Sequence, residues 1–575
     1  MRFLFLQTNI RPPNSSRLQI SPRLWQVKNM QKIVTAEEMR QIDRLTTERY
    51  GISPLLLMEN AANAASRVIV EKLGGSVAGK SVLVLCGKGN NGGDGAALGR
   101  ILWLQGADVE VCLFGLADDT KDEARINFDI LRKITEDEGF ELSQSDLAFE
   151  EITGLEEWLD YDSLNFHSDD PDVLVDALFG TGLTRPLDGV FEQVAAFIDA
   201  FSDPDGDSET LVVSLDIPSG LCADDADCIG ANARANVTVT FTAPKLANIL
   251  PPAGNCNGEL YVANIGSPCS LINETLSQTF LAEAEDAARW LAQTEFTSDS
   301  YKNKRGHALL IAGSANYSGA AVLCGNAAVR SGVGLVTIAT PESSKASIVA
   351  RVAPEVMVRG ISETADGAVS ENAFDELEAF SANADVISIG SGLSSGDDST
   401  RHLVRRVVEE RTTPVVIDAD GLNALAPLDL SGSDEFPLIL TPHAGEFKRL
   451  AGSTNGTGFK DRVNTARSFA QKHHVILVLK GERVVIAEPD GRVVINPTGN
   501  SGLGKAGNGD TLTGIITGFV AQAVQTKTDI TDAVIAAVYL AGLAGDIAEK
   551  KFGKRVMTAS DTAEALADCF QLFNE

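Results

Sequence analysis

The sequence contains no pair of cysteines at the CxxC spacing and no cluster of histidines, which argues against a zinc site. Its eight cysteines are spread over the chain at Cys86, Cys112, Cys222, Cys228, Cys256, Cys269, Cys324 and Cys569. Several of them lie inside apolar runs. We therefore interpret them as reduced, mostly buried thiols and expect a cytoplasmic protein.

Long apolar runs and a positive net charge are also missing. The most apolar run, residues 533–544, is too short to span a membrane and predicts a buried helix. Lysine and arginine number 48 against 79 aspartates and glutamates, which gives a formal net charge of −31. This charge excludes non-specific binding to nucleic acid or to an anionic membrane, so we expect neither as a partner.

With 575 residues, the chain is too long for a single ordinary core. Residues 1–31 predict a leader, because the first 30 residues carry five basic side chains and no acidic one. This leader is either targeting-like or, as the interpretation that we favour, disordered or the result of a misplaced start, since Met30 opens a well-patterned segment. A capping-box pattern, Thr35 followed by Glu38, predicts the start of the first helix.

Two series of apolar runs alternating with helical stretches follow, and they predict two α/β domains with parallel sheets. We place the first domain at residues 32–270 and the second at 271–575. Residues 267–300 between the two series are expected to be mostly helical. In the second series, residues 484–496 predict a hairpin that turns at Pro489-Asp490-Gly491.

The stretch GKGNNGGDG follows the apolar run of residues 82–85 and has the GxGxxG spacing of a dinucleotide-binding loop. We expect the helix after it to begin near residue 96, with its N–H groups facing an anion. Two details argue against a dehydrogenase. Glu110 lies in the middle of the second strand rather than at its end, and Asp94 within the loop would repel a pyrophosphate unless it caps the helix or lies near a cation.

Two further strand ends carry oxygen ligands, in DALFGTGLTRP after Asp176 and in DIPSG from Asp216 to Ser219. Each aspartate alone would more often be a cap or a turn residue. The ends of parallel strands share one edge of a sheet, however, so Asn91, Asp176 and Ser219 are expected to converge on a cation.

GNNGGDG, DALFGTGLTRP, DIPSG and TFTAPK, in this order, resemble the NAD(P)H-hydrate epimerase family over residues 33–266. That family interconverts the R and S forms of 6-hydroxy reduced nicotinamide nucleotides, called NAD(P)HX, and uses a potassium ion. The resemblance implies a Rossmann-like three-layer α/β/α domain with potassium held by Asn91, Asp176 and Ser219. It assigns substrate contacts to Asn90, Asn91, Gly92, Gly93, Asp94, Gly180, Thr181, Gly182, Leu183, Thr184, Arg185, Pro186 and Asp216. We take Asp216 as the catalytic acid or base, with Lys245 as a second candidate.

The second half lacks the P-loop pattern GxxxxGK[ST], which excludes that class of NTPase. It has instead NPTGNSGLGKAGNGDTLTG at residues 496–514. Glycines before a helix expected to start at Thr511 predict an anion cradle, with Asp510 beside it as the base for a hydroxyl that attacks a phosphoryl group. The alternative is a glycine-rich helix entry in which Asp510 is only the cap.

This half resembles the ribokinase-like ADP-dependent NAD(P)H-hydrate dehydratases over residues 275–575. The motifs that carry the resemblance are KNKRGHALLIAGSANYSGAA, GVGLVTIATP, IDADGLNAL, LTPHAGEF and the stretch 496–514. It implies adenylate contacts from Lys480, Gly481, Glu482, Arg483, Val484 and Gly509. It also implies hydrate contacts from Ala320, Gly392, His443 and the catalytic Asp510. Gly504 departs from the family, which has alanine there. Magnesium is expected with the nucleotide, which is ADP or, as an alternative, ATP.

The combined prediction is a nicotinamide-nucleotide repair enzyme, an isomerase fused to a lyase, with NAD(P)HX and ADP as ligands. Self-association is expected because such families form homo-oligomers. One alternative is a ribokinase-like kinase of a small alcohol or vitamin precursor fused to a ligand-binding domain. A second alternative is a nucleotide-sensing binding protein without turnover.

Overall fold

The computed structural model describes residues 18–19, 30–136, 145–165, 170–202, 209–452 and 461–573, with backbone only at 18–19 and 162–165. The described residues form two compact units: residues 18–19 and those from 32 to 277 form the first, and residues 30–31 and those from 278 to 573 form the second. The sequence placed the boundary at 270/271. The leader expected over residues 1–31 lies outside the described residues, apart from residues 18–19 and 30–31.

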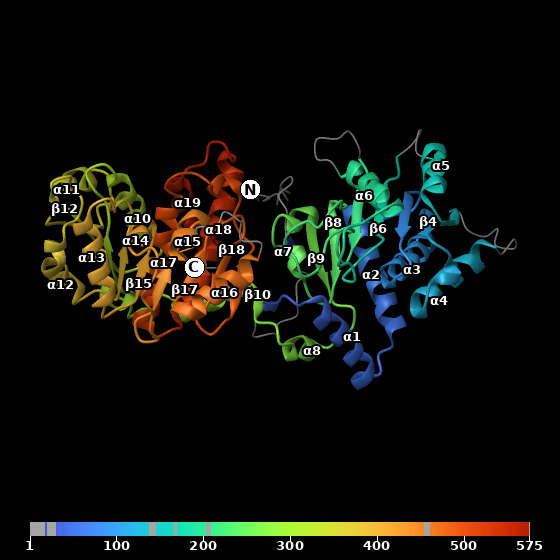
Figure 1. Ribbon diagram of the computed structural model, residues 1–575, viewed down its shortest axis with the longest axis horizontal. Helices are drawn as coiled ribbons and strands as arrows, with labels where there is room; N and C mark the ends of the chain where they lie inside the picture. The colour runs from blue at the N-terminus through green and yellow to red at the C-terminus, as the bar shows by residue number, and fades with distance from the viewer. Residues whose placement is uncertain are drawn as a thin grey trace, which may run out of the picture. The chain divides into compact units, whose positions relative to one another are not determined.

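The first unit contains helices and strands in alternation (Figure 1). Its strands are β1 (Leu18–Gln19), β3 (Ser81–Cys86), β4 (Asp108–Phe114), β5 (Leu147–Ile152), β6 (Val173–Ala177), β7 (Leu211–Leu215), β8 (Val237–Phe241) and β9 (Glu259–Ala263). Its helices are α1 (Ala36–Tyr50), α2 (Pro54–Lys72), α3 (Asn90–Leu104), α4 (Asp122–Thr135), α5 (Leu155–Asn165), α6 (Val190–Phe201), α7 (Leu246–Ile249) and α8 (Cys269–Glu274).

The described strands of the first unit form one parallel sheet in the order β1-β9-β8-β7-β6-β3-β4-β5. Side chains alternate between its two faces. On β3, Val82 and Val84 pack in the cluster that contains residues of α2 and α3, whereas Leu83 packs in the cluster that contains residues of α5 and α6. This arrangement is the expected three-layer α/β/α fold. The strand order reverses between β3 and β6, which is where open α/β sheets bind their ligands.

Helix α1 begins with the predicted capping box. The Thr35 hydroxyl accepts a hydrogen bond from the Glu38 N–H at 3.2 Å, and Glu38 Oε2 accepts one from the Thr35 N–H at 2.9 Å. Met39 and Ile42 bury the apolar side of the helix. The cap and the apolar side fix the position of the helix. They therefore also fix the direction in which Asp43, on the same turn, projects.

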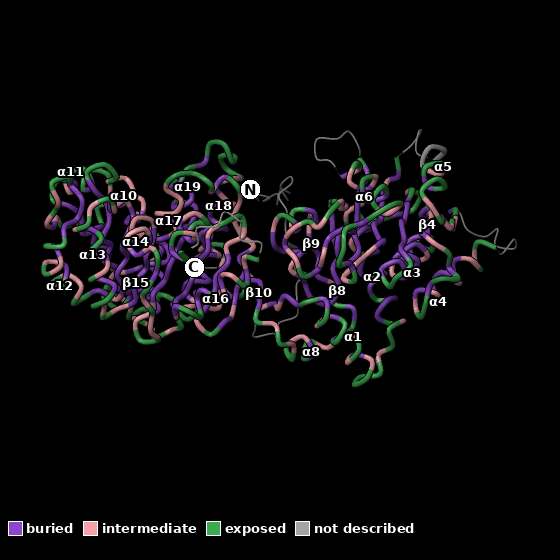
Figure 2. The backbone as a smooth tube through the Cα atoms, in the orientation of Figure 1, coloured by how far each residue is buried: buried purple, intermediate pink, exposed green. Residues whose placement is uncertain are grey.

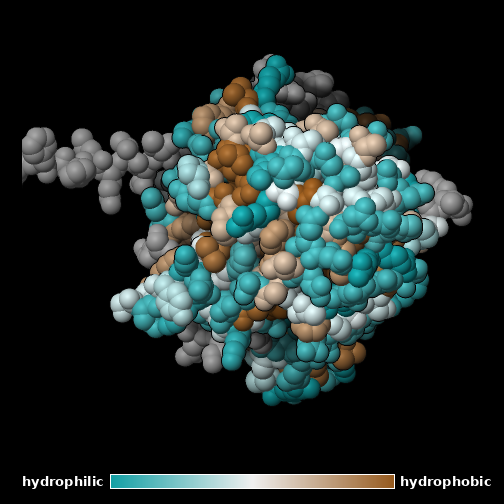
Figure 3. Space-filling view, turned by 90° about the vertical axis from the view of Figure 1, so that its left-hand side faces the viewer, coloured by the Kyte–Doolittle hydropathy of each residue, from teal (hydrophilic) through white to brown (hydrophobic). Residues whose placement is uncertain are grey.

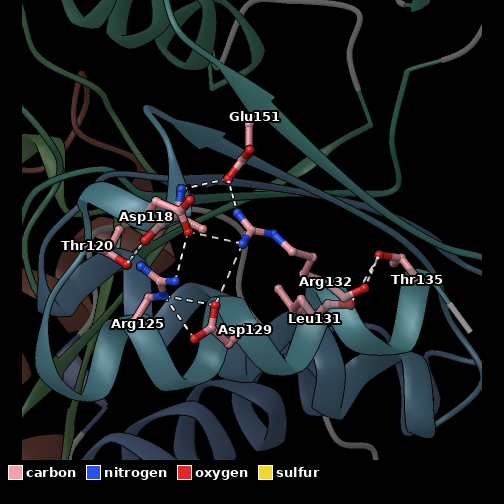
Figure 4. A network of polar contacts seen from close by, with 9 residues as sticks. Asp118, Thr120, Arg125, Asp129, Leu131, Arg132, Thr135 and Glu151 are labelled. Atoms are coloured by element: carbon pink, nitrogen blue, oxygen red, sulfur yellow. Dashed lines mark hydrogen bonds and ion pairs between the residues drawn. The ribbon is translucent and has the colours of Figure 1, made fainter.

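A polar network joins α4 to the short turn Ala117–Asp119 after β4 and to the edge strand β5 (Figure 4). Arg125 and Arg132 of α4 contact Asp118 at 2.8 and 3.2 Å, and Arg132 also contacts Glu151 of β5 at 2.8 Å. Hydrogen bonding from Arg132, with the charge of Arg125, lowers the pKa of Asp118 below its usual value. The sequence analysis did not predict β5, whose acidic sequence LAFEEI lacks a clear apolar alternation.

The second unit has more strands. They are β10 (Thr279–Leu281), β11 (His307–Ile311), β12 (Leu335–Pro341), β13 (Met357–Ile361), β14 (Val386–Ile389), β15 (Val415–Ile417), β16 (Leu438–Leu440), β17 (Ile476–Leu479), β18 (Val484–Ala487) and β19 (Val493–Asn496), with β2 (Gln31–Lys32) at the edge. Its helices are α9 (Ala284–Gln293), α10 (Ser318–Arg330), α11 (Glu342–Val349), α12 (Phe374–Ser381), α13 (Asp398–Glu409), α14 (Ala419–Ala424), α15 (Ala444–Leu450), α16 (Arg462–His473), α17 (Asn508–Thr526), α18 (Ile530–Phe552) and α19 (Ala559–Leu572).

The described strands of the second sheet follow the order β13-β12-β11-β14-β15-β16-β17-β18-β19-β10-β2. Pairing is parallel from β13 to β17 and antiparallel for β17-β18-β19, so the predicted hairpin is confirmed. The expectation that residues 267–300 are mostly helical is wrong at β10, which pairs with β19. A strand of three residues is too short to show a period of two.

Helices α10, α17 and α18 share one core cluster with the inner residues of β11, such as Ala308 and Leu310. Trp290 of α9 stacks on Phe519 of α17 with ring centroids 4.2 Å apart. Among the described helices, α18 alone is long and apolar enough to cross a membrane. Its apolar residues are buried in this cluster, which confirms the expected core helix (Figure 2).

The face drawn in Figure 3 carries mainly hydrophilic side chains, with hydrophobic ones in smaller groups between them. This distribution agrees with the formal net charge of −31 and with the small number of large apolar side chains that are exposed among the described residues.

Candidate active sites

The first site lies where four neighbouring strands of the first unit end, namely β3, β6, β7 and β8. Asn91 follows β3, Asp176 ends β6, Asp216 follows β7 and Lys245 follows β8. The prediction that these strand ends share one edge of the sheet is therefore confirmed.

The helix after β3 starts earlier than predicted. Helix α3 begins at Asn90 rather than near residue 96, so the glycine-rich stretch forms its first turns instead of a loop. A Cβ atom on Gly92 would lie 1.7 Å from the carbonyl oxygen of Gly87. Only glycine permits this approach, which brings the helix start and its free N–H groups close to the end of β3.

A cavity of about 610 Å³ opens at this edge. Most of the predicted substrate residues line it, namely Asn90, Asn91, Asp94, Gly180, Thr181, Gly182, Leu183, Arg185, Pro186 and Asp216. Gly92 and Gly93 are buried within α3, and the exposed Thr184 is not part of the lining. The cavity also contains Lys245, the second catalytic candidate.

Asp216 and Lys245 form a buried ion pair. Lys245 Nζ lies 2.6 Å from Asp216 Oδ1, and it also donates to Thr240 Oγ1 and to the Phe241 carbonyl oxygen, both at 3.0 Å. The Lys245 side chain is fully buried, and these three partners accept its hydrogen bonds. The Asp216 backbone has a φ of +64°, a left-handed conformation that costs free energy at a non-glycine residue.

The three predicted cation ligands surround the segment Phe179–Gly180. Ser219 Oγ donates to Asp176 Oδ1 at 2.5 Å and accepts from the Phe179 N–H at 2.9 Å. The amide oxygen and nitrogen of Asn91 are buried and have no hydrogen-bond partner among the described residues. A Cβ on Gly180 would lie 3.5 Å from Asn91 Oδ1, which places this amide beside the same segment. Unpaired buried amide atoms are costly unless a ligand or an ion satisfies them.

Two further carboxyl groups line the cavity. Burial, with the charge of Asp216, raises the pKa of Asp43 to about 6, and burial raises that of Asp94 well above its usual value. The raised pKa favours the neutral form of Asp94, which weakens its repulsion of an anion at the start of α3. The sequence analysis missed Asp43, because one aspartate on a helix that also carries exposed acids gives no distinguishing signal.

The second site lies at the corresponding edge of the second sheet. The neighbouring strands β14, β15, β16 and β17 end near Gly392, Asp418, His443 and Lys480. Helix α17 starts at Asn508, so the prediction of a start at Thr511 is wrong by three residues. Gly509 and Asp510 thus belong to the first helical turn, whose N–H groups have no partner within the helix and can bind an anion.

Asp510 is the third residue of α17, and Gly507 is the cap, which excludes the interpretation of Asp510 as the cap. Burial and the charge of Asp418 raise the pKa of Asp510 to about 6, an effect that the charge of Lys480 partly offsets. A carboxyl group with this pKa can accept a proton near neutral pH.

Lys480 is fixed at the helix start by a second buried ion pair. Its Nζ lies 2.8 Å from Asp418 Oδ1, and Thr513 Oγ1 of α17 donates to Asp418 Oδ2 at 2.8 Å. A Cβ on Gly509 would lie 3.4 Å from Lys480 Nζ. Lys480, Gly509 and Asp510 are therefore together, as predicted. Asp418 holds Lys480 and α17 together through these two contacts, although no role was predicted for it from the sequence.

The predicted hydrate residues lie on the loops around this helix start. Gly392 has a φ of +67°, and a Cβ on it would lie 2.9 Å from Ala320 Cβ, so these two residues are in close contact. His443 is the cap of α15. Its Nδ1 accepts from the Gly445 N–H at 3.0 Å, and its exposed ring lies 3.5 Å from Glu446. The charge of Glu446 also acts on Lys480, which links His443 to the same group.

The remaining predicted nucleotide residues form the turn between β17 and β18. Arg483 donates to the Pro497 carbonyl oxygen, and its own carbonyl oxygen accepts from Arg462 at 2.7 Å. A Cβ on Gly481 would lie 2.5 Å from Arg462. Glu482 is exposed, and Val484 begins β18. The turn is therefore tied to residues 496–498, where the glycine-rich stretch begins.

Buried hydroxyl groups without a hydrogen-bond partner in the described residues lie at the same strand ends, on Ser314, Thr340 and Ser391. They follow or end β11, β12 and β14. The Gly313 N–H donates to the Ser391 carbonyl oxygen at 2.8 Å, which joins two of these loops. Buried hydroxyl groups of this kind need water or a ligand as their partner. No sequence motif indicated them.

Two family models match the chain. The one described as YjeF-related protein N-terminus matches residues 55–247, and the one described as NAD(P)H-hydrate dehydratase matches residues 308–568. The bifunctional NAD(P)H-hydrate repair enzyme Nnr of Moorella thermoacetica is 38% identical over 535 residues, which cover 93% of this chain and 96% of that protein. The chain belongs to the family of bifunctional NAD(P)H-hydrate repair enzymes. The relative of the same name from Thermofilum pendens is 36% identical and covers 92% of this chain and 94% of its own.

One half of this repair enzyme is similar to a solved structure, the ADP/ATP-dependent NAD(P)H-hydrate dehydratase from Bacillus subtilis co-crystallised with ATP and Mg²⁺. It is 34% identical, covers 48% of this chain and 94% of its own, and has a TM-score of 0.42. The family that both sets of motifs predicted is thus confirmed over nearly the full length of the chain.

Proposed function

We propose that the chain repairs hydrated NADH and NADPH in two reactions, one in each unit. The first unit epimerises R- and S-NAD(P)HX, and the second dehydrates the S form at the expense of ADP. The observation that carries the proposal is the presence of both sites in one chain of the repair-enzyme family: the cavity with the Asp216–Lys245 pair and the α17 start with Asp510. We refer to the units below as the epimerase unit and the dehydratase unit.

In the epimerase unit, the substrate occupies the cavity at the switch point of the sheet. The carbon that inverts carries a hydroxyl group and is bonded to the ring nitrogen, so loss and return of water through an iminium ion can invert it. The Asp216 carboxylate, paired with Lys245, serves as the base and stabilises the positive charge.

In the dehydratase unit, Asp510 accepts the proton of the hydrate hydroxyl, whose oxygen then attacks the terminal phosphoryl group of the nucleotide. N–H groups of the first turn of α17 and the Lys480 ammonium stabilise the transferred phosphoryl group. The ring nitrogen lone pair then expels phosphate, and loss of a proton from the neighbouring ring carbon restores NAD(P)H.

ADP is the proposed co-substrate, and ATP is the alternative. Magnesium enters with the nucleotide, where it offsets phosphate charge. In the described residues, no group of three or more His, Cys, Asp or Glu side chains is placed to hold a metal ion. This fits an ion that is bound mainly through phosphate and water, as Mg²⁺ commonly is.

Potassium is proposed for the epimerase unit. The carboxylate of Asp176, the hydroxyl of Ser219 and the unpartnered amide oxygen of Asn91 form an oxygen donor set that suits it. When bound, the ion would add positive charge beside the cavity. If the proposal holds, the epimerase unit melts at a higher temperature in KCl than in NaCl of equal ionic strength. Asn91→Ala removes this difference, whereas an identical difference in that variant contradicts the assignment.

The test of the function uses S-NADHX, full-length chain and either ADP or ATP. Recovery of reduced-nicotinamide absorbance supports repair, and comparison of the nucleotides identifies the co-substrate. A stable phosphorylated product would favour the kinase alternative instead, and absence of any turnover would favour the binding protein.

A cytoplasmic location is proposed from the eight cysteines, all of which are free thiols, since a reducing compartment maintains them. NAD(P)HX and ADP are the proposed ligands, and nucleic acid and membrane are not proposed partners. Self-association stays a prediction, which a mass measurement in solution tests.

A further inference from the structure

The cavity of the epimerase unit contains an acidic residue that no motif marks, Asp43 of α1. Met39 and Arg40, one turn before it, also line this cavity, so this side of α1 forms part of its wall. The Oδ1 atom of Asp43 is buried and has no hydrogen-bond partner among the described residues. A buried carboxyl oxygen without a hydrogen-bond partner costs free energy. The hydroxyl group of a substrate bound in the cavity would be such a partner.

Asp43 and Asp216 have opposite surroundings within one cavity. Asp216 is in contact with the Lys245 ammonium at 2.6 Å, whereas no cation is in contact with Asp43 among the described residues. Burial and the charge of Asp216 raise the pKa of Asp43 to about 6, although Lys245 partly offsets the effect. Two carboxyl groups with such different surroundings in one site can divide the roles of base and acid between them.

We propose that Asp43 is the proton donor of the epimerase, acting on the hydroxyl group of the hydrate while Asp216 acts as the base. This inference rests on the proposed function and adds a catalytic residue to it.

In the proposed reaction, water leaves the substrate carbon and another water molecule adds to its other face. The ring nitrogen lone pair forms the carbon–nitrogen double bond, the carbon–oxygen bond breaks with its electron pair going to oxygen, and Asp43 gives its proton to that oxygen. Water leaves, and an iminium ion and the Asp43 carboxylate remain. A water molecule then adds to the other face of the planar carbon, the double-bond electrons return to nitrogen, and Asp216 accepts the proton of that water. Proton exchange with water in the open cavity returns both groups to their starting state.

Asp94 is the other candidate acid. Its pKa is raised well above that of a usual carboxyl group, by burial first and then by Asp216 and Asp43. Among the described residues, the buried oxygens without a hydrogen-bond partner include Asp43 Oδ1 but neither carboxyl oxygen of Asp94. Asp43 therefore fits the role of the proton donor better than Asp94 does. The charged and titratable groups that share the cavity are Arg40, Lys88, Asp94, Glu123, Arg185, Asp188, Asp216 and Lys245.

The test compares Asp43→Asn, Asp43→Glu and Glu48→Gln in the full chain. Glu48→Gln is the matched control, since it removes one negative charge from the exposed side of the same helix. Purified R-NADHX is incubated without nucleotide, and its conversion to the S form is followed against the uncatalysed rate. Asp43→Asn is expected to lower kcat by about 10²–10⁴-fold with a smaller change in KM, whereas Glu48→Gln retains the wild-type rate.

The pH profile separates proton donation from a structural role. Asp43 must be protonated to act, so wild-type kcat/KM should fall as pH rises through about 6. Asp43→Asn should lose this limb, and Asp43→Glu should retain it with a shifted midpoint. Wild-type rate and an unchanged limb in Asp43→Asn overturn the role of Asp43 and leave the proposed function intact. Absence of epimerisation by the wild type overturns both.

Discussion

Each unit contains a buried lysine–aspartate pair close to the first turn of a glycine-rich helix. Lys245 and Asp216 are 2.6 Å apart at the epimerase site, and Lys480 and Asp418 are 2.8 Å apart at the dehydratase site. A buried ion pair contributes little net stability, because desolvation offsets the attraction. Both pairs are therefore better explained by what they place at the site: an ionised Asp216 facing the cavity, and a cation next to Asp510.

The residue that decides dehydration is Asp510. We expect Asp510→Asn to lower the rate of ADP-dependent NADH recovery from S-NADHX by about 10²–10⁴-fold, because the variant cannot accept the hydroxyl proton. Epimerisation in the same chain should continue at the wild-type rate. Full dehydratase activity in the variant would show that another group is the base.

The pH dependence of dehydration has a definite sign. As a base, Asp510 must be ionised, and its pKa is about 6. The wild-type rate should therefore rise with pH through about 6 and level off above it, when initial rates are measured over a pH series with saturating ADP. A rate that falls over this range would contradict the role of Asp510 as a base.

Removal of one partner of a buried pair costs more than the pair contributes. Lys245→Met leaves the Asp216 carboxylate buried without its cation, so the free energy of unfolding of the epimerase unit should fall by about 3–5 kcal/mol. Native-state hydrogen exchange of β6, β7 and β8 amides measures this locally. Lys80→Met, which breaks a partly exposed ion pair with Asp172, is the control and should cost about 0–1 kcal/mol. Equal losses in the two variants would refute this account.

At the scale of elements, the sequence predicted the strands that carry the sites but not the starts of the helices that follow them. Apolar runs located β3, β6, β7 and β8, and their parallel order brought the strand-end motifs together. Helices α3 and α17 begin at asparagines followed by glycines, which are poor helix formers. Tertiary packing outweighs that propensity: a Cβ on Gly93 would lie 2.8 Å from Cα of Ala124 in α4 and 2.8 Å from the side chain of Met58 in α2.

The place of Asp43 in the cavity could not be predicted from the sequence, because it also depends on tertiary packing. Its helix was expected from a cap and an apolar stripe, yet only the packing of that helix at the sheet edge brings Asp43 to the cavity. Asp418 lies within a quoted motif, but the motif gives no indication that it pairs with Lys480 across 62 residues of sequence. Short or edge strands such as β5, β10 and β13 were missed because they show little periodicity.

Helix α17 packs so closely on α10 that a single added methyl group should destabilise the dehydratase unit. A Cβ on Gly514 would lie 2.2 Å from the Cys324 carbonyl oxygen of α10, so Gly514→Ala must push the helices apart. The dehydratase unit should lose about 1–3 kcal/mol or more and melt at a lower temperature. Gly396→Ala in the same unit, where a Cβ meets nothing within 4 Å, is the control. Equal melting temperatures for the two variants would contradict the packing argument.

At the scale of the whole molecule, the two sites belong to two units of one chain. A fusion of this kind provides an epimerase that supplies the form the dehydratase accepts. Because the residues assigned to each site belong to one unit, loss of one activity should leave the other intact.

The most direct test of the account is the amplitude of NADH recovery from a mixture of R- and S-NADHX with ADP. The wild type should convert both forms at enzymatic rates. Asp216→Asn should convert the S form at the wild-type rate and leave the R form to its slow uncatalysed epimerisation. Rapid conversion of both forms by Asp216→Asn would contradict the assignment of epimerisation to this site, and recovery of neither form by the wild type would contradict the proposed repair function.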